Sequence, residues 1–180
     1  MGNGAVPAGN PLNPQFEETL NTLSHELMHR WGAYAHFRKT GGTTSTALLG
    51  KDGSHWSYLL DTQGSFMYGN GWKDNGGTFT STAAQSAYSS LDLYLMGMIP
   101  KEQVSPMLLI DNTAIDKTQL PQLGATITGT ATTVTIDDII TAEGQRIPNS
   151  TNSQKEFKIG YVLLTQQGGS VADYVTAIEP

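Results

Sequence analysis

The segment His25-Glu26-Leu27-Met28-His29 has the pattern H-E-x-x-H. On a helix, two histidines four residues apart project from the same face within roughly 6 Å of each other, so they can share one metal ion. Zinc bound by imidazole is tetrahedral, and a catalytic zinc site keeps three protein ligands and one position for water. Glu26 lies about 100° around the helix from His25 and can act as the general base for that water without being a ligand.

The pattern requires a helix, and the surrounding residues predict one. Apolar residues recur in steps of three and four, which is typical of one face of a helix: Phe16, Leu20, Leu23, Leu27, Trp31 and Tyr34. Asn13 is a candidate N-cap, Pro14 suits the first helical position, and Glu17 and Glu18 place negative charge near the start of the helix. Gly32 marks a position where this long helix could end.

Two further histidines are candidates for the third ligand. On an unbroken helix His36 would lie about 10.5 Å beyond His29 along the axis, so it can reach the same ion only if the chain folds back at Gly32. His55 lies in a polar stretch with several aromatic residues, residues 43–80, which we predict to be irregular and folded over a site. Spacing alone does not decide which of these two histidines is the third ligand.

The rest of the chain predicts short elements. Ser89 or Ser90 caps a short helix closed by Gly97, and Asp92 fits the capping-box position of Ser89 better than the role of a metal ligand. We also expect a half-exposed strand over 126–136, a helix opened by Thr135 and Asp138 that ends at Gly144, a buried strand over 157–165, and a last helix over 170–178. These elements predict an α+β fold, with residues 1–180 forming one domain.

Composition excludes several classes of function. The 180 residues carry a formal net charge of -6 without a basic cluster, so nucleic acid and anionic membranes are poor partners. The chain has no cysteine, which excludes disulfides and thiolate zinc sites. No apolar run approaches the length of a membrane span, and the first ten residues lack the features of a signal peptide.

Several motifs together resemble the metzincin zinc peptidases, and most closely their leishmanolysin-like branch. The motifs, in order, are His25-Glu26-Leu27-Met28-His29-Arg30-Trp31-Gly32, Ser54-His55-Trp56, Phe66-Met67 and Tyr88-Ser89-Ser90-Leu91. The resemblance implies a zincin-like catalytic core, Zn²⁺ as the cofactor, and hydrolysis of peptide or protein substrates. It also implies that His55 is the third ligand and that Met67 forms the methionine turn beneath the metal. The same run of motifs is similar to uncharacterised bacterial secreted proteins, which implies export.

The chain departs from the metzincin pattern in one respect that concerns function. Metzincins carry a twisted sheet before the active-site helix, and here only 24 residues precede His25. Either the chain is a fragment of a longer polypeptide, or its substrate is held differently. The alternative to a peptidase is a zinc-stabilised binding or structural module without productive catalysis. A metal-dependent hydrolase of another substrate is a weaker alternative, and calcium binding by the Asp74-Asn75-Gly76-Gly77 turn stays open.

Overall fold

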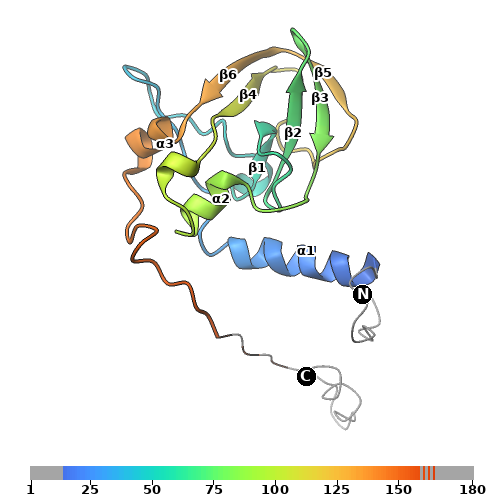
Figure 1. The fold of residues 1–180 in the computed structure, drawn as a ribbon. Helices are drawn as coiled ribbons and strands as arrows, with labels where there is room; N and C mark the ends of the chain where they lie inside the picture. The colour runs from blue at the N-terminus through green and yellow to red at the C-terminus, as the bar shows by residue number, and fades with distance from the viewer. Residues whose placement is uncertain (1–13, 159, 161, 163, 165–180) are drawn as a thin grey trace.

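The computed structural model describes residues 14–158, 160, 162 and 164. In these residues the chain forms a mixed α/β structure with few helices and one six-stranded sheet (Figure 1). The helices are α1 (Pro14–Met28), α2 (Ser90–Leu95) and α3 (Ile136–Glu143), with short 3-10 helices η1 (Lys51–Gly53) and η2 (Lys101–Gln103). The strands are β1 (Trp56–Asp61), β2 (Tyr68–Asp74), β3 (Thr78–Ala83), β4 (Met107–Asp111), β5 (Thr126–Thr128) and β6 (Thr130–Val134). The prediction of mixed helix and sheet is therefore confirmed.

The sheet has the order β5-β3-β2-β1-β4-β6, and its two edge strands are neighbours in the sequence. The predicted single strand over 126–136 is wrong, because the chain breaks at Gly129 into β5, which pairs with β3, and β6, which pairs with β4. A side chain at Gly129 would lie 2.9 Å from the Asp111 carbonyl oxygen, so glycine allows the close approach. One residue joins opposite edges, and the sheet must therefore curve strongly.

The centre of the sheet comes from the segment that the sequence predicts to be irregular. Residues 43–80 hold β1, β2 and the start of β3, so that prediction is wrong. The sequence pattern does not predict these strands because they bury polar side chains as well as apolar ones. Ser57 and Asn70 are both fully buried, and the Asn70 amide donates to the Tyr58 carbonyl oxygen (2.9 Å). Polar groups that are satisfied inside the protein remove the alternation that identifies a strand.

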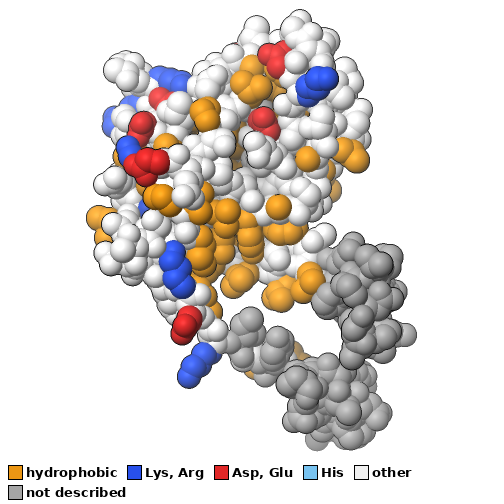
Figure 2. Space-filling model, viewed as in Figure 1, with side chains coloured by type: hydrophobic (Ala, Val, Ile, Leu, Met, Phe, Trp, Pro, Cys, Tyr) orange, Lys and Arg blue, Asp and Glu red, His pale blue; other side chains and the backbone are white. Residues whose placement is uncertain are grey.

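Helix α1 ends earlier than the predicted apolar stripe. It ends at Met28, whose side chain is fully buried, and His29 lies in the turn that follows. Leu20, Leu23 and Leu27 are 42%, 49% and 46% exposed, so this part of the stripe does not face the core, whereas Trp31 after the helix packs against it. Figure 2 shows hydrophobic side chains gathered at the level of α1 and α2. The predicted N-cap, Asn13, lies outside the described residues.

The predictions for the two short helices are confirmed. Ser89 caps α2 in a capping box with Asp92, and Gly97 adopts φ +77° just after the helix. Thr135 caps α3 in the same way with Asp138, and Gly144 follows its last residue. Helix starts with a reciprocal side-chain bond are recognisable because all the required atoms are local in sequence.

The predicted buried strand over 157–165 is not found in its described part. Phe157, Val162 and Leu164 are 44%, 85% and 88% exposed, and none of the described residues there is in a strand. The remaining residues of that stretch and the predicted helix over 170–178 lie outside the described part of the chain. No helix in the described ranges is both long and apolar enough to cross a membrane.

Candidate metal centre

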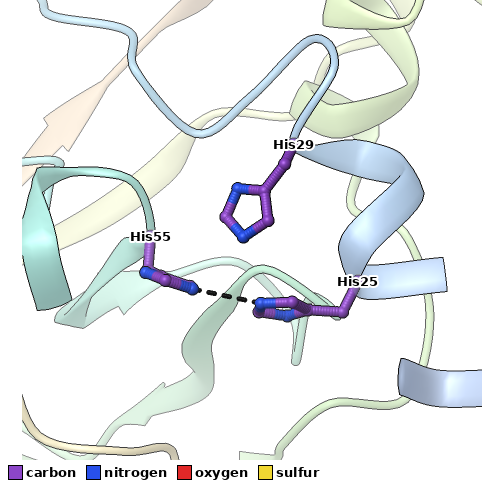
Figure 3. A group of neighbouring side chains, drawn as sticks. All are labelled: His25, His29 and His55. Atoms are coloured by element: carbon purple, nitrogen blue, oxygen red, sulfur yellow. Dashed lines mark hydrogen bonds between the residues drawn. The ribbon is translucent and has the colours of Figure 1, made fainter. Parts of the chain in front are cut away.

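The structure brings His25, His29 and His55 together (Figure 3). One nitrogen from each ring can be chosen so that all three lie within 4.8 Å of one another. The ring centroids of His29 lie 4.9 Å from those of His25 and of His55, and both pairs are nearly perpendicular. The His25 and His55 rings lie 5.0 Å apart and nearly parallel, with an interplanar angle of 25°. Three imidazoles that converge in this way form a donor set suited to a metal ion.

Two of the three rings have their tautomer fixed by a backbone carbonyl. His25 Nδ1 lies 2.7 Å from the Phe66 carbonyl oxygen, and His55 Nδ1 lies 2.9 Å from that of Lys51. A carbonyl oxygen only accepts hydrogen bonds, so each Nδ1 must carry the hydrogen. In a neutral imidazole the other nitrogen, Nε2, then has a lone pair, which is the form that binds a metal.

The two Nε2 atoms face each other across 3.1 Å. In the neutral tautomers neither Nε2 carries a hydrogen, so the contact places two lone pairs together. The lone pairs repel each other unless a cation lies between them. Two nitrogens bound to one zinc at about 2.0–2.1 Å and a tetrahedral angle lie about 3.3 Å apart, close to the separation observed. The Nε2 atoms of His25 and His55 therefore have the separation of two ligands on one ion of zinc's size, and all three histidines offer nitrogens within 4.8 Å of one another.

Burial favours the neutral form of the His55 imidazole. Its side chain is 7% exposed, and this burial lowers the pKa of His55 below its ordinary value. The neighbouring His25 and His29 lower this pKa further, whereas the hydrogen bond to Lys51 raises it. Because a metal ligand must be unprotonated, a lowered pKa favours metal binding over proton binding.

His36, the other candidate for the third ligand, lies elsewhere. The chain does leave the helix before Gly32, as a role for His36 would require, but His36 Nδ1 lies 2.5 Å from a carboxylate oxygen of Glu143 in α3. The backbone N–H of His36 donates to the same oxygen (2.8 Å). His36 is thus part of a link between the segment after α1 and α3, and His55 is the histidine that joins His25 and His29.

Met67 lies in the tight turn that supports the histidines. It is fully buried, and its carbonyl oxygen accepts from the Trp56 backbone N–H next to His55 (2.8 Å). The preceding residue, Phe66, supplies the carbonyl that orients His25. These contacts place the turn against two of the three candidate ligands. The role of Met67 as a methionine turn beneath a metal stays a prediction.

Asp92 ties this turn to the strand that carries His55. Its carboxylate is fully buried and accepts from Trp56 Nε1 (2.8 Å), from the Ser65 hydroxyl (2.6 Å) and from the Ser89 backbone N–H (2.7 Å). The Ser65 hydroxyl in turn accepts from the Met67 backbone N–H (2.8 Å). Burial raises the pKa of Asp92, while the hydrogen bonds from these donors lower it. The Asp92 carboxylate therefore holds Trp56, which follows His55 in the chain, and Ser65, which precedes the residue whose carbonyl oxygen contacts His25.

We expect Asp92→Asn to weaken both the fold and metal binding. The amide nitrogen of asparagine would face at least one of the three buried donors, and a buried donor without an acceptor costs roughly 1–3 kcal/mol. We predict that unfolding of the metal-free protein becomes easier by about 3 kcal/mol, measured by denaturant melts, and that zinc affinity falls about tenfold.

The matched control for that variant is Asp138→Asn in α3. Asp138 has the same capping-box role, but no hydrogen bond connects it to a histidine of the cluster among the residues described. Its replacement should cost about 1 kcal/mol of stability and leave zinc affinity unchanged. Equal zinc affinity in Asp92→Asn and the parent protein would show that this network supports the fold alone.

A cleft of about 500 Å³ opens beside His25. His25, Glu26 and Asn21 of α1 lie on one side, and Tyr68 and Gln85 also line it. Within the described chain no residue pairs with the Glu26 carboxylate, which is exposed, so its oxygens can accept a hydrogen bond from a water molecule. A cavity of about 530 Å³ elsewhere is lined by apolar residues such as Phe37, Leu59 and Leu109 and includes none of the candidate residues. The chemistry is therefore assigned to the cleft at α1.

Comparison of the chain with protein-family models, with curated proteins and with solved structures finds no match. The residues of the site and their geometry are therefore the basis on which a function is assigned. Sequence reasoning identified the three histidines and Glu26 but not the carbonyl oxygens of Lys51 and Phe66, because every residue has a carbonyl and only the fold selects these two. It also assigned Asp92 only to a local cap, since its bonds to Trp56 and Ser65 depend on tertiary structure.

Proposed function

We propose that the protein is a zinc-dependent endopeptidase with His25, His29 and His55 as the metal ligands. The observation that carries the proposal is the pair of Nε2 atoms, 3.1 Å apart, on rings whose Nδ1 atoms are both committed to carbonyl oxygens. Three imidazoles with an adjoining open cleft match a catalytic zinc site better than a structural one, which would have four protein ligands. The resemblance to metzincins supports the same assignment and a zincin-like core.

Each residue of the site has a definite task. A bound zinc ion supplies a Lewis acid that polarises a peptide carbonyl and acidifies water. The three histidines hold that ion, and the cleft along α1 receives the substrate beside it. Glu26 accepts a proton from the attacking water and delivers it to the amide nitrogen as the carbon–nitrogen bond breaks. The products are a carboxylic acid and an amine, so the step balances with water as the only co-reactant.

The identity of the metal and the location of the protein are also proposals. Imidazole suits zinc, copper, iron and nickel, and zinc is the metal that three histidines and an open position most often serve in hydrolysis. The resemblance to bacterial secreted proteins supports action outside the cell, where an endopeptidase meets protein substrates.

The proposal is tested by following cleavage of an unfolded protein, such as reduced carboxymethylated lactalbumin, by the purified full chain. We expect hydrolysis at internal peptide bonds, loss of hydrolysis on treatment with 1,10-phenanthroline, and recovery on addition of zinc in slight excess. A chain that binds zinc tightly yet cleaves neither this substrate nor a mixed peptide library would overturn the peptidase assignment and favour the zinc-stabilised binding or structural module.

A further inference from the structure

Tyr68 is the aromatic residue in closest contact with the candidate metal ligands in the described structure. Its ring stacks on that of His55, with centroids 4.5 Å apart and an interplanar angle of 17°. The same ring lies 5.1 Å from the His25 ring at an angle of 41°. Tyr68 also lines the cleft beside His25. One side chain thus covers a face of two ligands at the point where substrate would enter.

The backbone of Tyr68 is held in a conformation that tyrosine rarely adopts. Its φ is +75°, in the left-handed region where a side chain with a Cβ is strained. Two hydrogen bonds hold it there: its N–H donates to the Ser65 carbonyl oxygen (3.1 Å), and its carbonyl oxygen accepts from the Thr62 hydroxyl (2.9 Å). Strained residues of this kind concentrate at functional sites, where the surrounding structure maintains them. A bulky residue at this position therefore needs a reason that its backbone does not supply.

The ring contacts supply that reason. Each imidazole is fixed at its Nδ1 edge by a carbonyl oxygen, Lys51 for His55 and Phe66 for His25. Contacts confined to this edge, which for His55 Nδ1 include the Ser54 hydroxyl oxygen at 3.2 Å, leave each ring free to tilt about it. A flat aromatic face packed against the ring removes this freedom and keeps Nε2 directed at the common point.

We propose that Tyr68 is a positioning residue that holds the imidazoles of His55 and His25 in the orientation required to bind the metal. The inference rests on the metal centre of the proposed function and not on the hydrolytic step. The contact depends on the ring and not on the hydroxyl group. Two substitutions of Tyr68, one that keeps the ring and one that removes it, should therefore differ in zinc affinity.

Tyr68→Phe keeps the ring and should bind zinc as tightly as the parent protein. Tyr68→Asn removes the ring but suits the backbone, because asparagine tolerates the left-handed conformation better than other non-glycine residues. We expect zinc affinity of the Asn variant to fall about tenfold, the lower end of the range for residues that orient metal ligands. Gln85→Asn is the matched control, since Gln85 also has a positive φ (+44°) and lines the same cleft.

The experiment measures the zinc affinity of the parent and the three variants, each as the whole 180-residue chain, by competition with a chromophoric chelator. Visible absorption of the Co²⁺-loaded proteins reports the coordination geometry, and melting temperature with chelator present reports the fold. The proposal expects weaker zinc binding and an altered cobalt spectrum for Tyr68→Asn alone, with a metal-free melting temperature at or above that of the parent.

Three results would overturn the proposal. Parent-like zinc affinity in Tyr68→Asn would show that the stack is not needed, while the metal centre itself would stand. A loss in Tyr68→Phe equal to that in Tyr68→Asn would assign the effect to the hydroxyl group. A parent protein that binds no zinc would remove the metal centre on which the inference rests. Because hydrolysis is not measured, failure of the peptidase assignment leaves this test unaffected.

Discussion

Replacing Glu26 by glutamine is expected to leave zinc bound and to lower the rate of peptide hydrolysis by about 10²–10⁴-fold. Glutamine has nearly the same shape as glutamate but cannot accept the proton of the attacking water. Glu26 is exposed in the cleft beside His25 and is not one of the three clustered ligands. The substitution therefore removes the base without removing a metal donor. Initial rates on a fluorogenic peptide, together with zinc content per chain, measure both parts of the prediction.

Glu18→Gln is the control for the Glu26 variant. Glu18 lies two turns earlier in α1 and lines the same cleft, so its replacement changes the charge of the cleft by the same amount. We expect this control to hydrolyse the peptide at nearly the parent rate. Full activity in Glu26→Gln, or an equal loss in both variants, would rule out Glu26 as the specific base.

Removal of the third histidine should have the largest effect on metal binding. We expect His55→Ala to weaken zinc binding by more than about 100-fold, beyond the range of changes that only orient a ligand. Two imidazoles and solvent would then hold the ion in a site that has lost its buried donor. The measurement is competition for zinc with a chelator of known affinity, supported by zinc content after gel filtration.

His36→Ala is the comparison that decides between the two histidines. His36 is bonded to Glu143 and lies outside the cluster, so its removal should leave zinc affinity unchanged and cost at most about 1 kcal/mol of stability. If His36→Ala loses zinc and His55→Ala retains it, the chain in solution folds back differently after α1, and the assignment of ligands is wrong.

Local patterns predicted the helices well and the sheet poorly. The capping boxes of α2 and α3 each involve residues within four positions of sequence. The pairs Ser89 with Asp92 and Thr135 with Asp138 could therefore be recognised directly. Strands β1 and β2 could not, since buried polar residues such as Asn70 interrupt their apolar pattern. The division of 126–134 into β5 and β6 depends on the curvature of the whole sheet, which a strand pattern does not encode.

The candidate site was predictable only in part. The predicted helix through both His25 and His29 is wrong, because α1 ends at Met28 and His29 lies in the following turn, yet the ring centroids of the two histidines do lie 4.9 Å apart. Spacing left His36 and His55 level, and the resemblance to metzincins favoured His55, the residue that the structure brings to the pair. The ring of Tyr68 and the carboxylate of Asp92 reach the histidines or their neighbours through tertiary contacts that no local pattern specifies.

The apolar stripe of α1 shows how a correct pattern can lead to an incorrect inference about burial. Leu20, Leu23 and Leu27 do share one face of a helix, as predicted, yet that face is exposed. Another part of the helix surface is held in place by the Tyr88 hydroxyl, which donates to the Ser24 carbonyl oxygen (2.7 Å), and by the contact of His25 with Phe66. Polar contacts with Tyr88 and Phe66, together with the buried side chain of Met28, therefore hold the helix at the site, whereas the leucines are exposed.

X-ray absorption at the zinc edge of the zinc-loaded full chain tests the central claim most directly. The account predicts one zinc per chain with three imidazole nitrogens at about 2.0–2.1 Å and one further light atom. His55→Ala, loaded at the same protein concentration, should lose one imidazole from this shell or fail to retain the ion. A parent spectrum with fewer than three imidazoles, a shell dominated by carboxylate oxygen, or no retained zinc would contradict the metal centre formed by His25, His29 and His55.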